Sequence, residues 1–155
     1  MNALRRNVLK GAAGASTVAI AVAAGLLKPT QAMAAWNEAA FEAKNVGDAM
    51  KGIGAAGPVD SKDIVIKAPD IAENGAVVPV EVSSNIAGTT SIAILAEKNG
   101  TPLIGNFNLS GGAQGFVSTR IKMGQTSLVR AVVKAGGKTY TAAKEVKVTI
   151  GGCGG

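Results

Sequence analysis

The chain has 155 residues, of which 16 are basic, 10 are acidic and none is histidine, and it contains one cysteine. This length suits a single domain, and without histidine the chain cannot build the Ser-His or Cys-His pairs that activate most enzymatic nucleophiles. Because the carboxylates also lack a spacing that would bring two together, we predict a protein that is not an enzyme, with no catalytic residue, no metal site and no cofactor of its own.

The first 34 residues have the pattern of an export signal. Arg5 and Arg6 precede an apolar run at 18–27, and small residues up to Ala34 suit a signal peptidase. Paired arginines are typical of the twin-arginine pathway, with a general secretory signal as the alternative. The apolar run is too short to span a bilayer. We therefore predict that residues 1–34 are cleaved and that the mature protein lies in the periplasm, without membrane association.

Cleavage after Ala34 would change the charge of the chain. The signal contains four basic residues and no acidic one, so 12 basic and 10 acidic side chains remain, a formal charge of +2. Aromatic residues make up only 3% of the chain, and the sequence shows no basic cluster beyond the signal. Nucleic-acid binding therefore has little support.

Residues 36–53 show helical periodicity. Their apolar side chains follow one another at spacings of three and four, the pattern of a helix with one buried stripe. The stripe consists of Trp36, Ala39, Ala43, Val46, Met50 and Ile53. Gly52 and Gly54 are expected to end the helix. We predict one helix that packs on its own domain, within an N-terminal helix and linker at 35–57.

From residue 62 onward, short β-rich runs alternate with turn residues. We predict seven strands, at about 62–68, 77–84, 90–98, 103–109, 115–123, 126–135 and 138–150. In the second, Val78, Val80 and Val82 alternate with other residues, and Pro79 indicates an edge or a bulge. Strands without helices between them predict an all-β fold, an immunoglobulin-like antiparallel β-sandwich of about seven strands at 58–150.

Two glycine-containing pairs predict tight hairpins in this sandwich. Asn99-Gly100 and Gly136-Gly137 both supply residues that accept positive φ, which two-residue hairpin turns require.

The chain ends in an unusual pentapeptide, with Cys153 between two pairs of glycines, Gly151-Gly152 and Gly154-Gly155. Glycine lacks a Cβ atom, so we expect residues 151–155 to form a flexible, narrow arm. Fully extended, five residues span roughly 17 Å. A lone cysteine in an oxidising compartment must be buried, paired with another molecule or used in chemistry. Burial does not suit a glycine-rich terminus, so the sequence predicts covalent attachment at Cys153.

The tail, the twin-arginine-like signal and the seven-strand body together resemble the SoxY family, the sulfur-carrier subunits of the periplasmic thiosulfate-oxidising Sox system. The segment at 71–80 is also similar to an early-strand pattern of that family. The resemblance implies a sulfur-substrate carrier of thiosulfate oxidation. Intermediates would be bound covalently to Cys153 and presented to partner enzymes by the glycine arm.

The same resemblance implies partners. A SoxZ-like subunit, a second immunoglobulin-like chain, would form a heterodimer with this one. A haem-containing SoxAX enzyme would conjugate thiosulfate to Cys153, and SoxB would hydrolyse off sulfate. In some organisms a molybdenum enzyme would oxidise the remaining sulfane sulfur. Catalytic residues and cofactors would lie on these partners.

Two alternatives remain at this point. In the first, the protein is an exported structural β-sandwich whose Cys153 forms an intermolecular disulfide, giving a disulfide-linked dimer. In the second, the terminal Gly154-Gly155 is activated as a thiocarboxylate, as in ubiquitin-like sulfur carriers. That chemistry takes place in the cytoplasm, which disagrees with the export signal.

Overall fold

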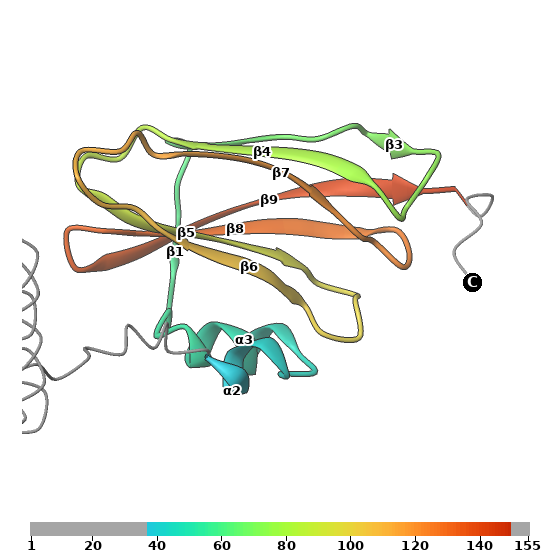
Figure 1. Ribbon diagram of the computed structural model, residues 1–155, viewed down its shortest axis with the longest axis horizontal. Helices are drawn as coiled ribbons and strands as arrows, with labels where there is room; N and C mark the ends of the chain where they lie inside the picture. The colour runs from blue at the N-terminus through green and yellow to red at the C-terminus, as the bar shows by residue number, and fades with distance from the viewer. Residues whose placement is uncertain (1–36, 150–155) are drawn as a thin grey trace, which may run out of the picture. The chain divides into compact units, whose positions relative to one another are not determined.

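The computed structural model describes residues 37–149, which form two β-sheets and a pair of short helices (Figure 1). One sheet has six strands, in the order β1-β9-β8-β5-β6 with β3 also paired to β9, and the other has three, in the order β2-β4-β7. The elements are α2 (Glu38–Phe41), α3 (Val46–Gly52), β1 (Val59–Asp60), β2 (Ile64–Lys67), β3 (Ile71–Ala72), β4 (Val78–Ser84), β5 (Thr89–Ala96), β6 (Leu103–Asn108), β7 (Phe116–Ile121), β8 (Ser127–Ala135) and β9 (Lys138–Val148). The predicted all-β sandwich is confirmed. The signal predicted at 1–34 and the arm predicted at 151–155 lie outside the described residues.

The core between the sheets is aliphatic. Val78, Val80 and Val82 of β4 are completely buried, and Ile92 and Ile94 of β5 belong to the same cluster. The predicted alternation along β4 is therefore confirmed. A fully buried side chain of this size stabilises the fold by about 1.5–3 kcal/mol.

β5 is buried on both faces. Ile92 and Ile94 face the core between the sheets, whereas Ala93 and Leu95 belong to a second cluster with residues of the helical pair. The helices thus form a third layer on the outer face of the six-stranded sheet, as Figure 1 shows. The prediction that the N-terminal helical segment packs on its own domain is confirmed. Within residues 37–149, no helix is long and apolar enough to cross a membrane.

The prediction of one continuous helix at 36–53 is wrong, because the segment forms two helices. Asn37 caps α2, and Asn45 caps α3 by accepting a hydrogen bond from the backbone N of Asp48 at 2.9 Å. An asparagine cap requires non-helical backbone, and Asn45 has φ −140° and ψ 158°. Polar capping therefore overrides the apolar spacing. Gly54, with φ 67°, follows α3 as predicted.

Residues 37–149 form nine strands, whereas the sequence predicts seven. The two additional strands, β1 and β3, contain two residues each, which is too short for an alternating pattern. Both pair in parallel with β9, so the sandwich is not purely antiparallel. The seven predicted strands all exist, with shorter bounds. β9 ends at Val148, and the predicted end at Ile150 lies outside the described residues.

One predicted two-residue hairpin is confirmed and the other is wrong. Gly136 and Gly137, with φ of 56° and 74°, connect β8 directly to β9. By contrast, β5 and β6 are joined by six residues, 97–102, and Gly100 has no positive φ. The side chain of Asn99 bonds to another loop instead, as described below.

Pro79 lies in the middle strand of the three-stranded sheet, yet at a local edge. The pairing of β2 with β4 ends at Lys67 and Glu81, so Pro79 lies beyond the last residue of β2. Proline has no N–H to donate, and at this position one side of β4 has no β2 partner. The predicted edge is confirmed in this local sense.

Candidate functional site

The residues predicted to carry the chemistry, Cys153 and its four neighbouring glycines, lie outside the described residues. The structure does describe the C-terminal end of β9, the strand that precedes them in the chain.

The end of β9 is held on both sides. On one side Ala72 of β3 pairs with Val148, and the backbone N of Thr149 donates to the carbonyl of Ala72 at 3.1 Å. On the other side Thr126 Oγ1 accepts a hydrogen bond from Val148 N at 2.9 Å and lies 3.4 Å from Val148 O. The chain therefore leaves the sandwich from a fixed point.

A buried glycine, Gly75, packs closely beside the end of β9. The backbone N of Met123 donates to the carbonyl of Gly75 at 2.7 Å. A Cβ atom at Gly75 would lie 2.4 Å from the carbonyl oxygen of Met123 and 2.8 Å from Val148 Cγ1. Only a residue without a side chain fits there. We call the segments 70–75, 122–126 and 146–149 the arm base.

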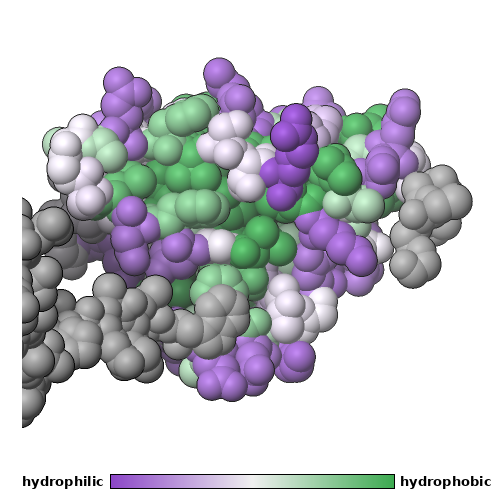
Figure 2. Space-filling view, viewed as in Figure 1, coloured by the Kyte–Doolittle hydropathy of each residue, from purple (hydrophilic) through white to green (hydrophobic). Residues whose placement is uncertain are grey.

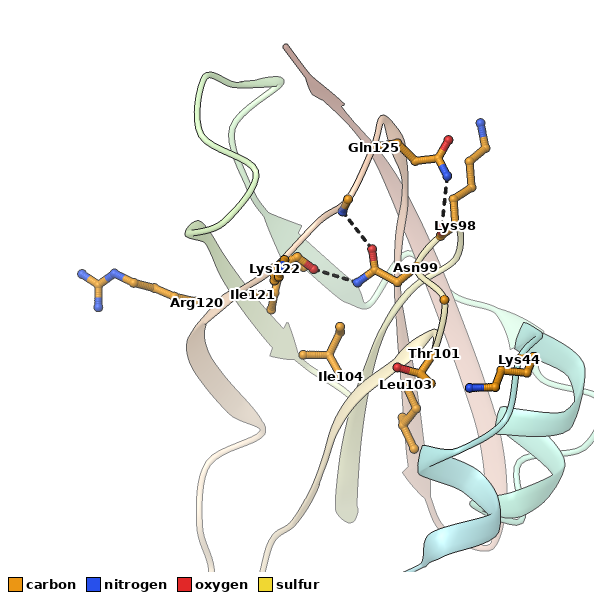
Figure 3. Close-up of a pocket in the computed structure, with 12 residues that line it drawn as sticks. Lys44, Lys98, Asn99, Thr101, Leu103, Ile104, Arg120, Ile121, Lys122 and Gln125 are labelled. Carbon is orange, nitrogen blue, oxygen red and sulfur yellow. Dashed lines mark hydrogen bonds between the residues drawn. The ribbon is translucent and has the colours of Figure 1, made fainter. Parts of the chain in front are cut away.

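A groove of about 810 Å³ opens at the same end of the sandwich. It lies between the β5–β6 loop (97–102) and the β7–β8 loop (122–126), and Figure 1 shows both loops at the end where β9 finishes. Figure 3 shows the side chains that line it. They belong to Lys44, Lys98, Asn99, Thr101, Leu103, Ile104, Arg120, Ile121, Lys122 and Gln125, with Gly100 and Gly124 completing the wall.

Side chains join the two loops of this groove. Asn99 Nδ2 donates to the carbonyl of Lys122 at 2.7 Å, and Asn99 Oδ1 accepts from the backbone N of Gly124 at 3.1 Å (Figure 3). Gln125 Nε2 donates to the carbonyl of Lys98 at 3.2 Å. The loop that borders the groove thus also holds Val148 through Thr126.

The groove is basic. Its lining includes three lysines and one arginine and no carboxylate. The sequence analysis found no basic cluster beyond the signal, and the structure corrects this, because the four residues come from separate segments. The only signal visible in the sequence was that Lys98 directly precedes the predicted turn at Asn99-Gly100.

The acidic side chains in the described part of the chain do not gather into a metal site. Within 37–149 no group of three His, Cys, Asp or Glu side chains could hold a metal ion. Half-buried Glu97 accepts from Arg130 Nε at 2.7 Å, and Asp70 lies 3.0 Å from Lys144 Nζ. A hydrogen bond from Asn45, aided by a nearby lysine, lowers the pKa of exposed Asp48. These carboxylates support structure at separate places.

Large apolar side chains are also exposed. Figure 2 shows apolar surface among polar side chains on one face of the protein. The exposed set consists of Val59, Val65, Ile71, Val77, Phe107, Phe116 and Leu128. Val65 and Phe116 flank Ser83 in register on the outer face of the three-stranded sheet. Contiguous apolar surface marks sites where partner proteins bind, whereas apolar residues exposed singly are common on soluble proteins.

A family model and one solved structure indicate the same family. Residues 50–153 match the family model of the sulfur oxidation protein SoxY. The structure is similar to that of the sulfur carrier protein SoxY from Chlorobium limicola f thiosulfatophilum, with 47% identity and a TM-score of 0.55 over 60% of this chain and 86% of that one. It also resembles a superoxide reductase (neelaredoxin) from Ignicoccus hospitalis, with 21% identity and a TM-score of 0.50 over 56% of this chain and 79% of that one, a likeness of fold alone. No curated protein matches the sequence.

Proposed function

This chain belongs to the SoxY family of sulfur oxidation proteins, and we propose that it carries sulfur intermediates covalently on Cys153. The observation that carries the proposal is the family match, which extends through residue 153 and so includes the only cysteine. The 47% identical sulfur carrier from Chlorobium supports the same role.

The proposed chemistry begins with the Cys153 thiolate. It forms a sulfur–sulfur bond with the outer sulfur of thiosulfate, and two electrons pass to a haem enzyme of the SoxAX type. Water then attacks the terminal sulfonate sulfur, releasing sulfate and two protons and leaving a persulfide on Cys153. A free cysteine has a pKa near 8.5, and the sequence around Cys153 offers no cation to lower it. Activation therefore falls to the enzyme that receives the arm.

The sandwich contributes a fixed base. The end of β9 is bonded on both sides, to Ala72 and to Thr126. Thr149 is the last described residue, and Cys153 follows four positions later. Glycines at 151, 152, 154 and 155 add no side chains that would hinder entry into an active-site channel. This combination of an anchored strand and a slender terminus suits a carrier.

We also propose the partners and the location that the SoxY family implies. A SoxZ-like subunit would cover part of the exposed apolar surface and form a heterodimer. SoxAX, SoxB and, in some organisms, a molybdenum enzyme would bind transiently. The paired arginines Arg5 and Arg6 support export by the twin-arginine pathway and a periplasmic location.

Intact mass spectrometry tests the covalent role. The exported protein is isolated from cells oxidising thiosulfate, and spectra are taken with and without reductant. We expect sulfur-containing adducts on Cys153 that reductant removes, and none in a Cys153→Ala variant. A thiol that stays unmodified under turnover would contradict the proposal. A disulfide-linked dimer as the main species would favour the structural alternative.

A further inference from the structure

We propose that the free edge of β6 and the basic groove beside it bind an extended acidic segment of another protein. The segment would add to the six-stranded sheet as a further strand and would place its carboxylates among the cations of the groove. We call residues 105–108, the regular part of this edge, the β6 edge. The inference goes beyond the proposed function, because it involves neither Cys153 nor a sulfur substrate.

β6 is the last strand of the six-stranded sheet. Within residues 37–149 it pairs with β5 on one side, and no strand pairs with it on the other. Opposite residues in an antiparallel pair alternate between exchanging backbone hydrogen bonds and directing these groups away from each other. Leu109 N donates to the carbonyl of Thr90 of β5 at 2.8 Å. By this alternation the backbone groups of Asn106 and Asn108 point away from β5. They can pair with an incoming strand, as in other proteins that bind peptides at a sheet edge.

A β-bulge ends the β6 edge and joins it to the groove. Gly105 pairs with Ile94 and Leu103 pairs with Leu95, so Ile104 is an extra residue between them. A bulge bends its strand and limits regular pairing, which also protects an open edge against uncontrolled association. Ile104 is itself part of the groove lining. A segment that pairs along 105–108 would therefore continue at Ile104 into the groove.

The groove supplies the charge that selects an acidic segment. Its four cations, Lys44, Lys98, Arg120 and Lys122, are exposed, and no carboxylate lines it. The ion pairs found among the described residues involve other cations. Figure 3 shows Lys44 and Arg120 on opposite sides of Ile104. A concave surface lined by one sign of charge attracts ligands of the opposite sign.

The floor of the groove favours a polypeptide over other polyanions. Leu103 and Ile121 are buried and Ile104 is half-buried, and all three contribute to the lining. Successive side chains of a strand point to opposite faces. A segment in which acidic and apolar residues alternate therefore offers carboxylates to the cations and apolar side chains to this floor. Single-stranded nucleic acid binds by stacking its bases on aromatic side chains, and the groove lining contains none.

Binding of a synthetic peptide tests the inference. The peptide has about eight residues, in which glutamate and valine alternate, and both of its ends are blocked. The exported protein is isotope-labelled and kept reduced, so that Cys153 takes no part. Nuclear magnetic resonance should show saturable shifts of the amides of Asn106, Asn108 and Gly124, with a Kd below about 1 mM. Hydrogen exchange at Asn106 and Asn108 should slow on binding, because the peptide accepts hydrogen bonds from their amides. The absence of shifts at about 1 mM peptide would overturn the inference.

Modified peptides separate strand addition from attraction by charge. Successive N–H groups of a strand point to opposite edges, so methylation of one alternating set of peptide nitrogens should abolish binding, whereas methylation of the other set should leave the Kd unchanged. If both methylated peptides bind like the parent, or if neither binds, strand addition is overturned. A peptide with lysine in place of glutamate should not bind. If it binds as well as the acidic peptide, the groove does not select charge.

Matched variants of the protein locate the site. In Lys98→Gln/Lys122→Gln, the Kd of the acidic peptide should rise roughly two- to thirtyfold, because two exposed ion pairs are lost. Lys62→Gln/Lys138→Gln makes the same charge change on exposed residues outside the groove and should leave the Kd unchanged. Equal effects of the two variants would overturn the groove as the site. Tighter binding of oligothymidylate than of the peptide would do so as well, because the groove would then be a nucleic-acid site. Since no sulfur substrate is present, these outcomes are independent of the mass-spectrometric test of the proposed function.

Discussion

Replacing Gly75 with alanine should loosen the arm base. The new Cβ would lie 2.4 Å from the carbonyl oxygen of Met123 and 2.8 Å from Val148 Cγ1. The first contact is with backbone, so rotation of a side chain cannot relieve it. Overpacking of this kind costs about 1–3 kcal/mol. With a slope of about 1.5 kcal/mol per molar urea for a small domain, the unfolding midpoint should fall by roughly 0.7–2 M.

Hydrogen exchange locates the damage. If the strain is relieved by local opening, the amides of Val148 and Thr149 should exchange roughly 5- to 150-fold faster, which is the factor that corresponds to 1–3 kcal/mol. Gly100→Ala is the matched control, because a Cβ there meets nothing within 4 Å and the residue has no positive φ. A Gly75→Ala variant within 0.5 kcal/mol of that control would refute the close packing described for the arm base.

Two further predictions concern the helical layer. Alanine is a better helix former than glycine, yet Gly52→Ala should lower the free energy of unfolding by about 1–3 kcal/mol, because its Cβ would lie 2.6 Å from that of Ala40. In the same helix, a Cβ at Gly47 would meet only Asn45 Oδ1, at 3.4 Å, so Gly47→Ala should raise the free energy of unfolding by about 0.5–1 kcal/mol. If urea unfolding finds Gly52→Ala more stable than Gly47→Ala, the close contact between Gly52 and Ala40 is contradicted. The pKa of Asp48, measured by resonance titration, should lie below its ordinary value and rise in Asn45→Ala, since the asparagine hydrogen bond is the main cause of the lowering. Because the pKa of Asp48 is lower in the folded state than in the unfolded state, its carboxylate stabilises the fold at pH values above the unfolded-state pKa. This contribution is lost as the pH falls through the folded-state pKa. A pKa that Asn45→Ala leaves unchanged would disprove the assignment.

The sequence was sufficient to predict the local structure wherever one physical rule dominated. Period-two alternation located β4 and its three buried valines, and the pair Gly136-Gly137 located the β8–β9 hairpin. In both places the local preference and the tertiary environment agree. The prediction of one helix at 36–53 was wrong because two rules conflict there. Apolar spacing favours one helix, but asparagine is more favourable as a cap than inside a helix, and Asn45 caps α3.

The arm base and the groove could not be predicted because they depend on long-range contacts. Asn99 was interpreted as a turn residue, yet its amide bonds to the loop that contains Gly124, 25 residues away. Gly75 lies between two predicted strands, and no local pattern shows that it packs closely against Met123. The four basic residues of the groove are separated by up to 78 positions, from Lys44 to Lys122. No local pattern contains such information.

The pairing of β9 bears on the proposed function, in which partner enzymes act on a residue that follows this strand. β8 borders β9 along one side, while β1 and β3 border two parts of the other, at 140–141 and 147–148. Strand pairs on both sides satisfy the backbone groups that an edge strand would leave open. A force on the terminus would have to break the bonds of Val148 and Thr149 before it reached the core. In the proposed function, partner enzymes that act on Cys153 should therefore leave the sandwich intact, and the two short parallel strands that the sequence did not reveal provide this protection.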